Sequence, residues 1–379
     1  MKKLMLVAAL LVFFAGQVYA ADWNFYGSAR VSTFKSDIET NPFTATRGNT
    51  DDYEQDINGN ARIGANVKVS DTLSADFEYG SKRAENLRIL WGEWDFGGGS
   101  LGVGQNYTPL LMPYSNQVYN IFARREGDVN MSLFGMLYGK RKPMVRLKFG
   151  KLLIAAVQPV TTVSMGTTTG FLGRAVPNTE VQLPSLQAKY TYETDWGHLA
   201  VAGGYQTFDV KVTGKLEHQV TSYVLAVGGR VNIGKAYLKG NLWGGQNVGN
   251  IADILVGGHI YSTGTGAVGT TPLDGASLGF AYYNNAGNGL VTDNDALASL
   301  IVAGYEIRKG LYVEAGYGYT RTELNTAGAV KDDANTWYIQ STIFLAPGVF
   351  VTPEIGSFDG NSATDPYITY YGIKWQINF

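Results

Sequence analysis

The sequence predicts an all-β protein, a transmembrane antiparallel β-barrel of sixteen strands. Three observations support this fold class. Hydrophobic and polar residues alternate along most of the chain, which is the pattern of strands with one apolar face. The connections between alternating segments are short and long by turns, as in barrels with short periplasmic turns and long extracellular loops. After residue 20, no run of about 18 apolar residues could form a membrane-spanning helix.

The composition narrows the class of protein further. Of the 379 residues only 16% are charged, against roughly 25% in an ordinary soluble domain, yet the mean hydropathy is −0.07. The chain has 48 Gly, 24 Tyr and no Cys. This composition argues against a bundle of membrane helices, a helical enzyme, a zinc protein, a disulfide-stapled module and a disordered chain.

Residues 1–20 have the features of a cleaved secretory signal. Two lysines precede an apolar run from Leu4 to Ala15, and Val18-Tyr19-Ala20 supplies the small residues of a cleavage site. The apolar run is too short to span a membrane comfortably. We therefore expect a mature chain of residues 21–379 that forms a single barrel domain. Its 28 basic and 32 acidic residues leave a net charge of −4, which gives no reason to expect nucleic-acid binding.

The expected strands follow from the alternation. In residues 61–69 the odd positions are Ala, Ile, Ala, Val and Val, whereas the even positions include Arg, Asn and Lys. Such strands suit a barrel with lipid outside and water inside. The strands are expected near 22–34, 56–69, 72–82, 86–96, 100–108, 143–150, 151–160, 183–194, 197–210, 219–233, 235–248, 296–308, 311–323, 334–346, 348–358 and 366–379.

Short turns set the number of strands. Seven are expected, at Ser70-Asp71, Gly97-Gly98-Gly99, Gly150-Lys151, Asp195-Trp196-Gly197, Gly234-Lys235, Lys309-Gly310 and Pro347-Gly348. They join seven pairs of strands and leave one strand at each terminus, which gives sixteen. Ala276 to Asn284 also resembles a strand, but counting it would place the termini on opposite sides of the membrane. We interpret it as a hairpin arm inside a long loop; the alternative is a barrel of eighteen strands.

Four segments resemble the trimeric general-diffusion porins of Gram-negative outer membranes. They are Phe25–Ala29, Asn60–Gly64, Gly104–Pro109, and the terminal Phe379 with its apolar partners Tyr371, Ile373, Trp375 and Ile377. In that family, the apolar ending is the signal that the barrel-assembly machinery recognises. The resemblance implies an outer-membrane location, a homotrimer, contacts with lipid and lipopolysaccharide, and passive diffusion of small hydrophilic solutes and ions through a water-filled channel.

The same resemblance implies that the third loop, here residues 109–141, folds into the pore as a constriction loop. Porins of this family set acidic loop residues against basic residues of the wall. The expected basic wall comprises Arg62, Arg146, Arg30, Lys148 and Gln105. Arg62 matches the basic residue of the second strand, and Arg30 can replace a Lys that many members carry at position 28. Gln105 stands where Arg is usual, and alternation directs it outward, so we rank it below Arg62.

The expected constriction residues of the loop are Glu126, Asp128, Arg124 and Arg125. The two acids and two arginines make residues 109–139 neutral overall. The acidic Pro-Glu-Phe-Gly-Gly motif of the family loop is absent. These features favour a wide, weakly selective pore.

Other functions stay open at this point. A substrate-selective channel for sugars or for anions such as phosphate is the closest alternative, and a surface-structural or adhesion barrel is a lesser one. We expect no enzymatic activity, because His198, His218 and His259 lie in no catalytic motif and the chain has no Cys nucleophile.

We expect no cofactor and no protein-bound metal. Three acidic clusters in loops are the candidates for divalent cations such as Ca²⁺: Asp51-Asp52, Asp293-Asn294-Asp295 and Asp332-Asp333. None of them has the spacing of a known calcium loop.

Overall fold

The computed structural model describes residues 21–39, 50–81, 86–120, 128–165, 178–211, 217–252, 254, 279–283, 290–329, 331–361 and 367–379. The predicted signal segment lies outside the described residues, as do Arg124, Arg125 and Glu126 of the third loop. The side chains of Asp51 and Asp52 are also outside the description.

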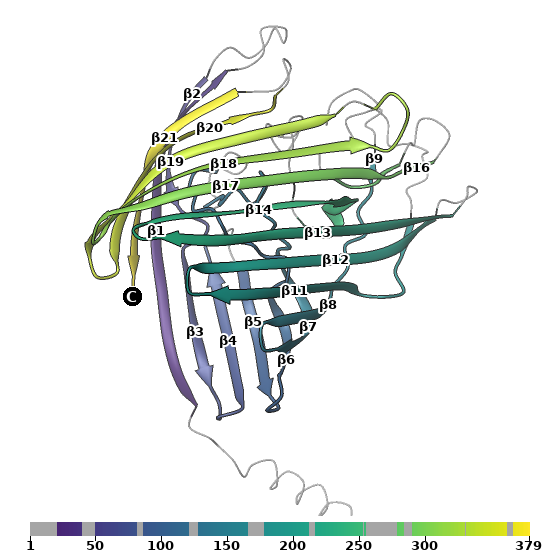
Figure 1. The fold of residues 1–379 in the computed structure, drawn as a ribbon, viewed down its shortest axis with the longest axis horizontal. Helices are drawn as coiled ribbons and strands as arrows, with labels where there is room; N and C mark the ends of the chain where they lie inside the picture. Colours follow the sequence, from purple (N-terminus) through teal and green to yellow (C-terminus); the bar gives the residue numbers. More distant parts are fainter. Residues whose placement is uncertain are drawn as a thin grey trace, which may run out of the picture.

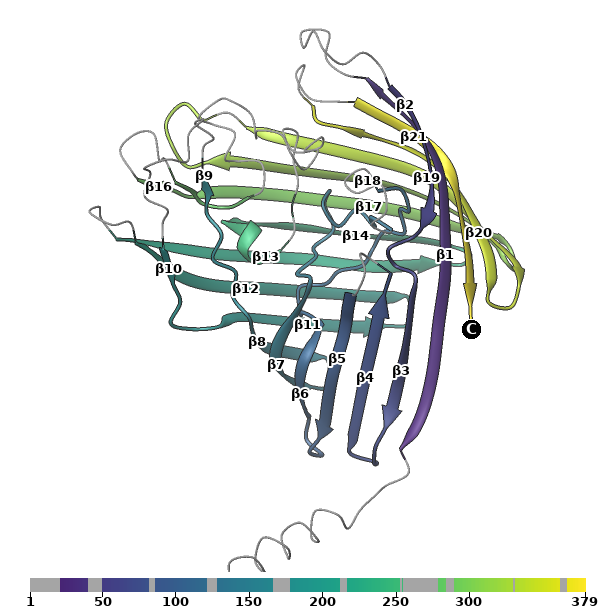
Figure 2. The same ribbon diagram turned by 180° about the vertical axis from the view of Figure 1, so that it is seen from behind.

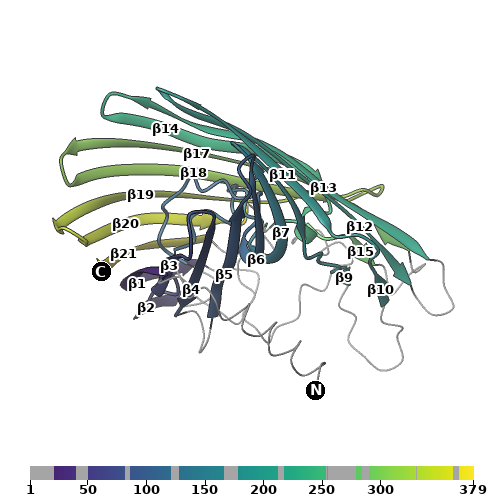
Figure 3. The same ribbon diagram turned by 90° about the horizontal axis from the view of Figure 1, so that it is seen from below.

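Sixteen strands form one closed antiparallel sheet (Figure 1). In order round the wall they are β1 (Asp22–Glu39), β3 (Arg62–Lys68), β4 (Leu73–Gly80), β5 (Asn86–Asp95), β6 (Ser100–Tyr107), β7 (Arg141–Phe149), β8 (Leu152–Val157), β11 (Ser185–Thr194), β12 (Gly197–Lys211), β13 (His218–Ile233), β14 (Ala236–Gln246), β17 (Asn294–Arg308), β18 (Leu311–Leu324), β19 (Asp332–Ala346), β20 (Val349–Asp359) and β21 (Tyr367–Asn378). The first strand pairs with the last, from Ser28↔Asn378 to Glu39↔Tyr367, and this pairing closes the barrel (Figures 2 and 3). The predicted fold class is confirmed.

Two wall strands are interrupted. A separate strand, β2 (Thr50–Ile57), pairs with the upper half of β1, while β3 pairs with its lower half. The sequence predicted one strand over 56–69, so the break at residues 58–61 is a correction. Its cause is a turn signal, Asn58-Gly59-Asn60: the Asn58 side chain accepts a hydrogen bond from the backbone N–H of Asn60, and Ala61 N donates to Asn58 O. Likewise β10 (Asn178–Glu180) and β11 both pair with β12.

The short turns fall where the sequence predicts them. Phe149 pairs with Leu152 and Ile233 pairs with Ala236, so Gly150-Lys151 and Gly234-Lys235 are two-residue hairpin turns. Gly150 has φ 56° and Gly234 has φ 58°. Glycine suits these positions because only it adopts this left-handed conformation without a steric penalty.

The strand-like segment near residue 280 is not part of the wall. Its described residues include β15 (Tyr282–Tyr283), which pairs with β16 (Val291–Thr292) and with β9 (Ser164–Met165) in a separate three-stranded sheet. This small sheet lies near the loop ends of β17 and β18 (Figures 1 and 2). The hairpin-arm interpretation is confirmed, and the wall has sixteen strands rather than eighteen.

The two faces of the wall differ as the alternation predicts, with one exception. Large apolar side chains cover the outward face, for example Phe25, Leu225 and Ile339, each more than half exposed. The inward face is mostly polar on β1 and β3, but on β12, β13 and β17 it carries small apolar residues. The buried ones include Ala200, Ala202, Val224, Ala226, Ala296 and Ala298. Within the described residues, no helix is long and apolar enough to cross a membrane.

Candidate pore constriction

The described parts of the third loop between β6 and β7, residues 108–120 and 128–140, pack inside the barrel. Leu110, Met112, Met131 and Leu137 are fully buried in one cluster with small inward residues of β12, β13 and β17 and with Trp243 of β14. Gly318 on β18 makes the close approach feasible, since a Cβ there would lie 1.9 Å from the backbone oxygen of Phe134. The loop therefore packs on an apolar patch of the inward wall, which is formed by the small residues of β12, β13 and β17 and by Trp243.

Polar contacts tie the loop to the same half of the wall. Asn241 Nδ2 and Trp243 Nε1 of β14 donate to the backbone oxygen of Gly135, at 2.7 and 2.9 Å. Two buried carboxylates on β18 and β20, Glu314 and Glu354, accept hydrogen bonds from the loop at residues 116–119. A loop with this many buried partners has one position against the wall.

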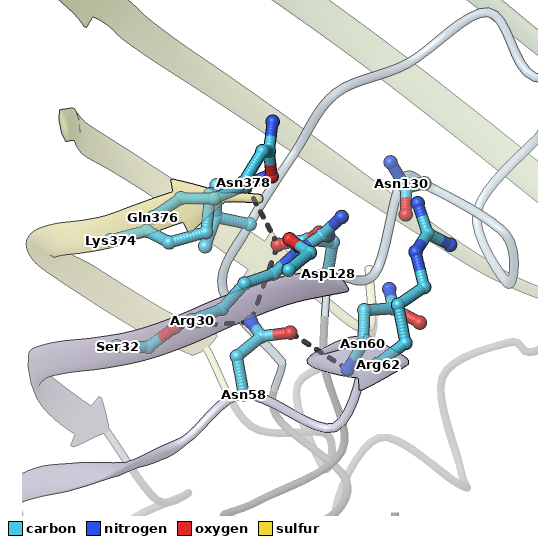
Figure 4. Close-up of polar contacts among 12 residues, drawn as sticks. Arg30, Ser32, Asn58, Asn60, Arg62, Asp128, Asn130, Lys374, Gln376 and Asn378 are labelled. Atoms are coloured by element: carbon cyan, nitrogen blue, oxygen red, sulfur yellow. Dashed lines mark hydrogen bonds and ion pairs between the residues drawn. The ribbon is translucent and has the colours of Figure 1, made fainter. Parts of the chain in front are cut away.

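Asp128 joins the loop to cations on β21 and β1, the strands that follow β20 round the wall. Its carboxylate lies 2.7 Å from the Arg30 guanidinium on β1 and 3.1 Å from Lys374 Nζ on β21, and it accepts a hydrogen bond from Asn58 (Figure 4). Burial alone would raise the pKa of Asp128, but Lys374 and Arg30 hold this pKa below its usual range. Asp128 is thus an ionised carboxylate with two cationic partners.

A second cluster surrounds Glu78 on β4. Its carboxylate lies 3.4 Å from Arg62 Nε, pairs closely with the Arg88 guanidinium, and accepts a hydrogen bond of 3.1 Å from the Tyr26 hydroxyl. Arg88 also donates to Asn60 Oδ1 at 3.0 Å. Arg88 and Glu78 are buried, whereas the Arg62 side chain is 31% exposed.

The position of Arg88 corrects the alternation. Strict alternation would put Arg88 on the same face as Leu90, but the β4–β5 register shifts between Glu78 and Tyr79, so one extra residue is inserted in β5. A β-bulge of this kind re-aims the side chain beside it. Arg88 therefore joins the inward cluster with Glu78 instead of facing lipid.

Among the described residues of these two clusters, four cations share two carboxylates. Arg30 and Lys374 have Asp128, while Arg62 and Arg88 have Glu78. Figure 4 shows Arg62 and Asn60 beside the Asp128 group. The excess of two positive charges is most accessible at Arg62, because the side chains of the other three cations are each 10% exposed or less.

The other expected wall residues lie elsewhere. Arg146 pairs with Glu93 at 2.9 Å and stacks over Trp91. Lys148 is exposed near the end of β7, two residues before the turn at Gly150. Neither is among the described contacts of Asp128 or Glu78. Gln105 is a correction: it pairs in register with Leu90 and Pro143 on the outward face, and its amide donates to the backbone oxygen of Leu87.

Several site residues were not singled out from the sequence. Lys374 and Glu78 lie at polar positions of alternating strands, outside the segments that resemble the porin constriction. The signal that could have selected them is their parity, because both occupy inward positions flanked by large outward residues. Arg88 and Asn58 had no such signal, since each depends on a break in the regular strand.

The C-terminal residues lie as the alternation predicts. Tyr371, Trp375, Ile377 and Phe379 are exposed on the outward face. The backbone of Phe379 exchanges two hydrogen bonds with Gly27, which ties the end of the chain to β1.

The described acidic residues of the loops have protein partners. Asp293 accepts a hydrogen bond from Asn247, and Asp333 accepts one from Tyr319. Among the described residues, no three His, Cys, Asp or Glu side chains are grouped so as to hold a metal ion.

Comparison with known proteins identifies the fold. No family model and no curated protein sequence matches the chain. Among solved structures, the outer membrane channel DcaP of Acinetobacter baumannii is similar with a TM-score of 0.64 and 14% identity, over 96% of this chain and 99% of that one. The chain has the fold of the outer-membrane porins. An anion-selective porin from Comamonas acidovorans is also similar (TM-score 0.54, 12% identity, 94% of this chain and 100% of that one). So is OmpF of Salmonella typhi in complex with daunomycin (0.54, 14%, 94% and 97%).

Proposed function

We propose that this porin-fold chain is an outer-membrane channel for the passive diffusion of small hydrophilic solutes and ions. A barrel of about sixteen strands encloses a lumen wide enough for water, whereas about eight strands would be filled by side chains. The observation that carries the proposal is the third loop, which extends from the apolar patch to Asp128 and the cations of β1 and β21. A loop placed in this way narrows the lumen and lines it with fixed charges.

A second candidate function is a channel that prefers anions. The observation that favours it is the charge excess of the Asp128 and Glu78 clusters, where four cations share two carboxylates. Rings of fixed charge set ion preference in a pore, and the exposed member here is Arg62. This candidate differs from the weakly selective pore that the neutral loop sequence favours.

The assembly and the surroundings of the channel belong to the same proposal. A similar solved structure, OmpT of Vibrio cholerae, is a trimer form (TM-score 0.51, 16% identity, 95% of this chain and 100% of that one). We infer a homotrimer that meets lipid and lipopolysaccharide with its outward apolar face. The outward C-terminal residues are suited to recognition by the assembly machinery.

Planar-bilayer recording of the purified protein tests both candidates. Channel formation predicts stable conductance steps, in groups of three for a trimer. Reversal potentials in a salt gradient then separate the two candidates. An anion-preferring pore gives a reversal potential shifted toward the equilibrium potential of the anion, whereas an unselective pore gives a value near zero. Absence of conductance from folded protein would contradict the channel.

A further inference from the structure

A row of basic side chains crosses three neighbouring strands of the wall near the short turns. His198 on β12 pairs in register with Arg230 on β13, and Arg230 pairs in register with Lys239 on β14 (Figure 1). All three residues have the inward parity of their strands, which places them on the lumen side. The row lies on other strands than the cations of the Asp128 and Glu78 clusters.

The charges of this row are balanced unequally. Basic side chains in register on adjacent strands repel each other when both are charged, so acids are needed to compensate. At one end of the row, Lys239 pairs with Glu314 at 2.8 Å. At the other end, His198 lies in register with Glu193 on β11. Arg230, in the middle, has no acidic partner in the part of the chain that the structure describes; its contacts there are with Asn232 and Tyr237.

The two contacts of Arg230 leave its forked end open. The Nε–H donates to Asn232 Oδ1 at 2.8 Å, and the guanidinium carbon lies 4.3 Å from the centre of the Tyr237 ring. The stacking uses the face of the guanidinium, so neither contact uses the N–H groups of Nη1 and Nη2. Those groups form the planar fork that binds the paired oxygens of a carboxylate or a phosphate. Both contacts therefore orient the fork without occupying it.

The third loop lies beside this row. Tyr114 Oη is 3.1 Å from His198 Nε2, and the two rings stack with their centroids 5.7 Å apart. Gly228, two residues from Arg230 on the same face of β13, makes room for Tyr114, since a Cβ there would lie 2.8 Å from the ring. Arg230 is consequently next to the loop, on the side of the short turns.

We propose that Arg230 is the centre of an oxyanion-binding subsite in the lumen, which takes small solutes that carry a carboxylate or phosphate group. The fork of Arg230 binds two oxygens of the anion, while His198 and Lys239 flank it from the adjacent strands. The subsite rests on the proposed channel function, because it binds a solute on the turn side of the constriction. Chloride has no pair of oxygens to match the fork, so it binds less well than acetate or phosphate.

The first test is the histidine NMR spectrum of the folded barrel, which does not require conduction. The chain has three histidines, so selective labelling gives few signals. With acetate or phosphate added at fixed pH and fixed ionic strength, we expect the His198 signal to shift along a saturable curve. His218, at the opposite end of β13 from Arg230, is the internal control and should not shift. The proposal would be overturned if neither anion gave saturation, if chloride acted as strongly, or if His218 shifted equally.

Two variants of Arg230 separate the fork from the charge. Arg230→Gln should weaken binding of the anion about 10-fold or more, the loss expected for a charge-assisted hydrogen bond. Arg230→Lys keeps the charge but lacks the fork, and it should also weaken binding. Lys235→Gln is the matched control, because it removes the same charge from the exposed turn next to β13 and should leave binding nearly unchanged. Wild-type binding in Arg230→Lys, or equal effects of Arg230→Gln and Lys235→Gln, would contradict the subsite.

Failures of the two proposals have different signatures. A wild-type barrel that binds acetate or phosphate at Arg230 but does not conduct would contradict the channel and support the subsite. A conducting channel whose His198 signal responds to neither anion would contradict the subsite and leave the channel supported.

Discussion

Two regions of the inner wall differ in the side chains that they present to the lumen. On β12, β13 and β17 the inward face under the third loop is apolar, and on β14 Trp243 is buried among loop residues while Asn241 donates a hydrogen bond to the loop. On β1, β3, β5 and β21 the inward face carries Arg30, Arg62, Arg88 and Lys374, held in ion pairs. The first region resembles the core of a soluble domain. The second region also holds the loop, because Tyr119 packs on Phe34 of β1 and on Tyr370 of β21. The difference is that the second region adds ion pairs to these apolar contacts, so β1 and β21 both hold the loop and carry the cations of the constriction.

The largest effect on conductance and stability is expected from adding a side chain where the third loop approaches β18. Gly318→Val adds a side chain where a Cβ already lies 1.9 Å from Phe134 O, so the loop must move, at a cost of about 1–3 kcal/mol or more. We expect altered single-channel conductance and a lower unfolding temperature. Gly92→Val is the matched control, since a Cβ there has no neighbour within 4 Å. Equal behaviour of the two variants would contradict a loop seated on β18.

A moderate effect is expected at the exposed member of the basic half. Arg62→Gln removes one of the two excess charges and should shift the reversal potential toward cations. Lys148→Gln removes the same charge near the turn rim and should shift it less. If Lys148→Gln had the greater effect, the selectivity would reside at the rim and not at the Glu78 cluster.

The pH dependence should be smaller and confined to acid. Because Lys374 and Arg30 lower the pKa of Asp128, the ion pairs stabilise the loop at every pH above the ordinary Asp pKa of about 3.9. This contribution is lost as the pH falls through the lower pKa of the folded state. Conductance should thus be steady from neutral to mildly acidic pH and change only in stronger acid. Asp128→Asn should remove the part of the acid response that comes from this group; an unaltered response would assign it to another carboxylate.

The smallest effect is expected on the turn rim. Lys151 and Glu193 form an ion pair of 3.4 Å, with both side chains more than half exposed. Such pairs contribute less than about 1 kcal/mol, so Lys151→Ala should leave both unfolding and conductance nearly unchanged. A large loss of stability in thermal unfolding would show that the turn rim matters more than its exposure indicates.

Much of the wall could be predicted from local sequence. Period-two alternation and glycine turns such as Gly150-Lys151 depend only on neighbouring residues, and they determined the strand number and the faces of β21. The interpretation of Ala276–Asn284 as a loop hairpin followed from the parity of strands. These features are local, and the structure retains them.

The site was less predictable because it depends on departures from regularity. The break at Asn58–Ala61 and the bulge beside Arg88 each re-aim a side chain, and alternation cannot place a residue next to such a break. Asp128 meets Lys374 across 246 positions of sequence, a contact that no local pattern encodes. The alanines of β12 and β17 are compatible with contact either with lipid or with protein. They pack against the third loop, which lies far from them in the sequence.

The most direct test of the central claim is the reversal potential of single channels of the folded protein in a salt gradient. The seated loop and the two ion-pair clusters predict stable conductance with a preference for anions that weakens in Arg62→Gln. A cation-selective wild-type channel, or a folded barrel that does not conduct, would contradict the account.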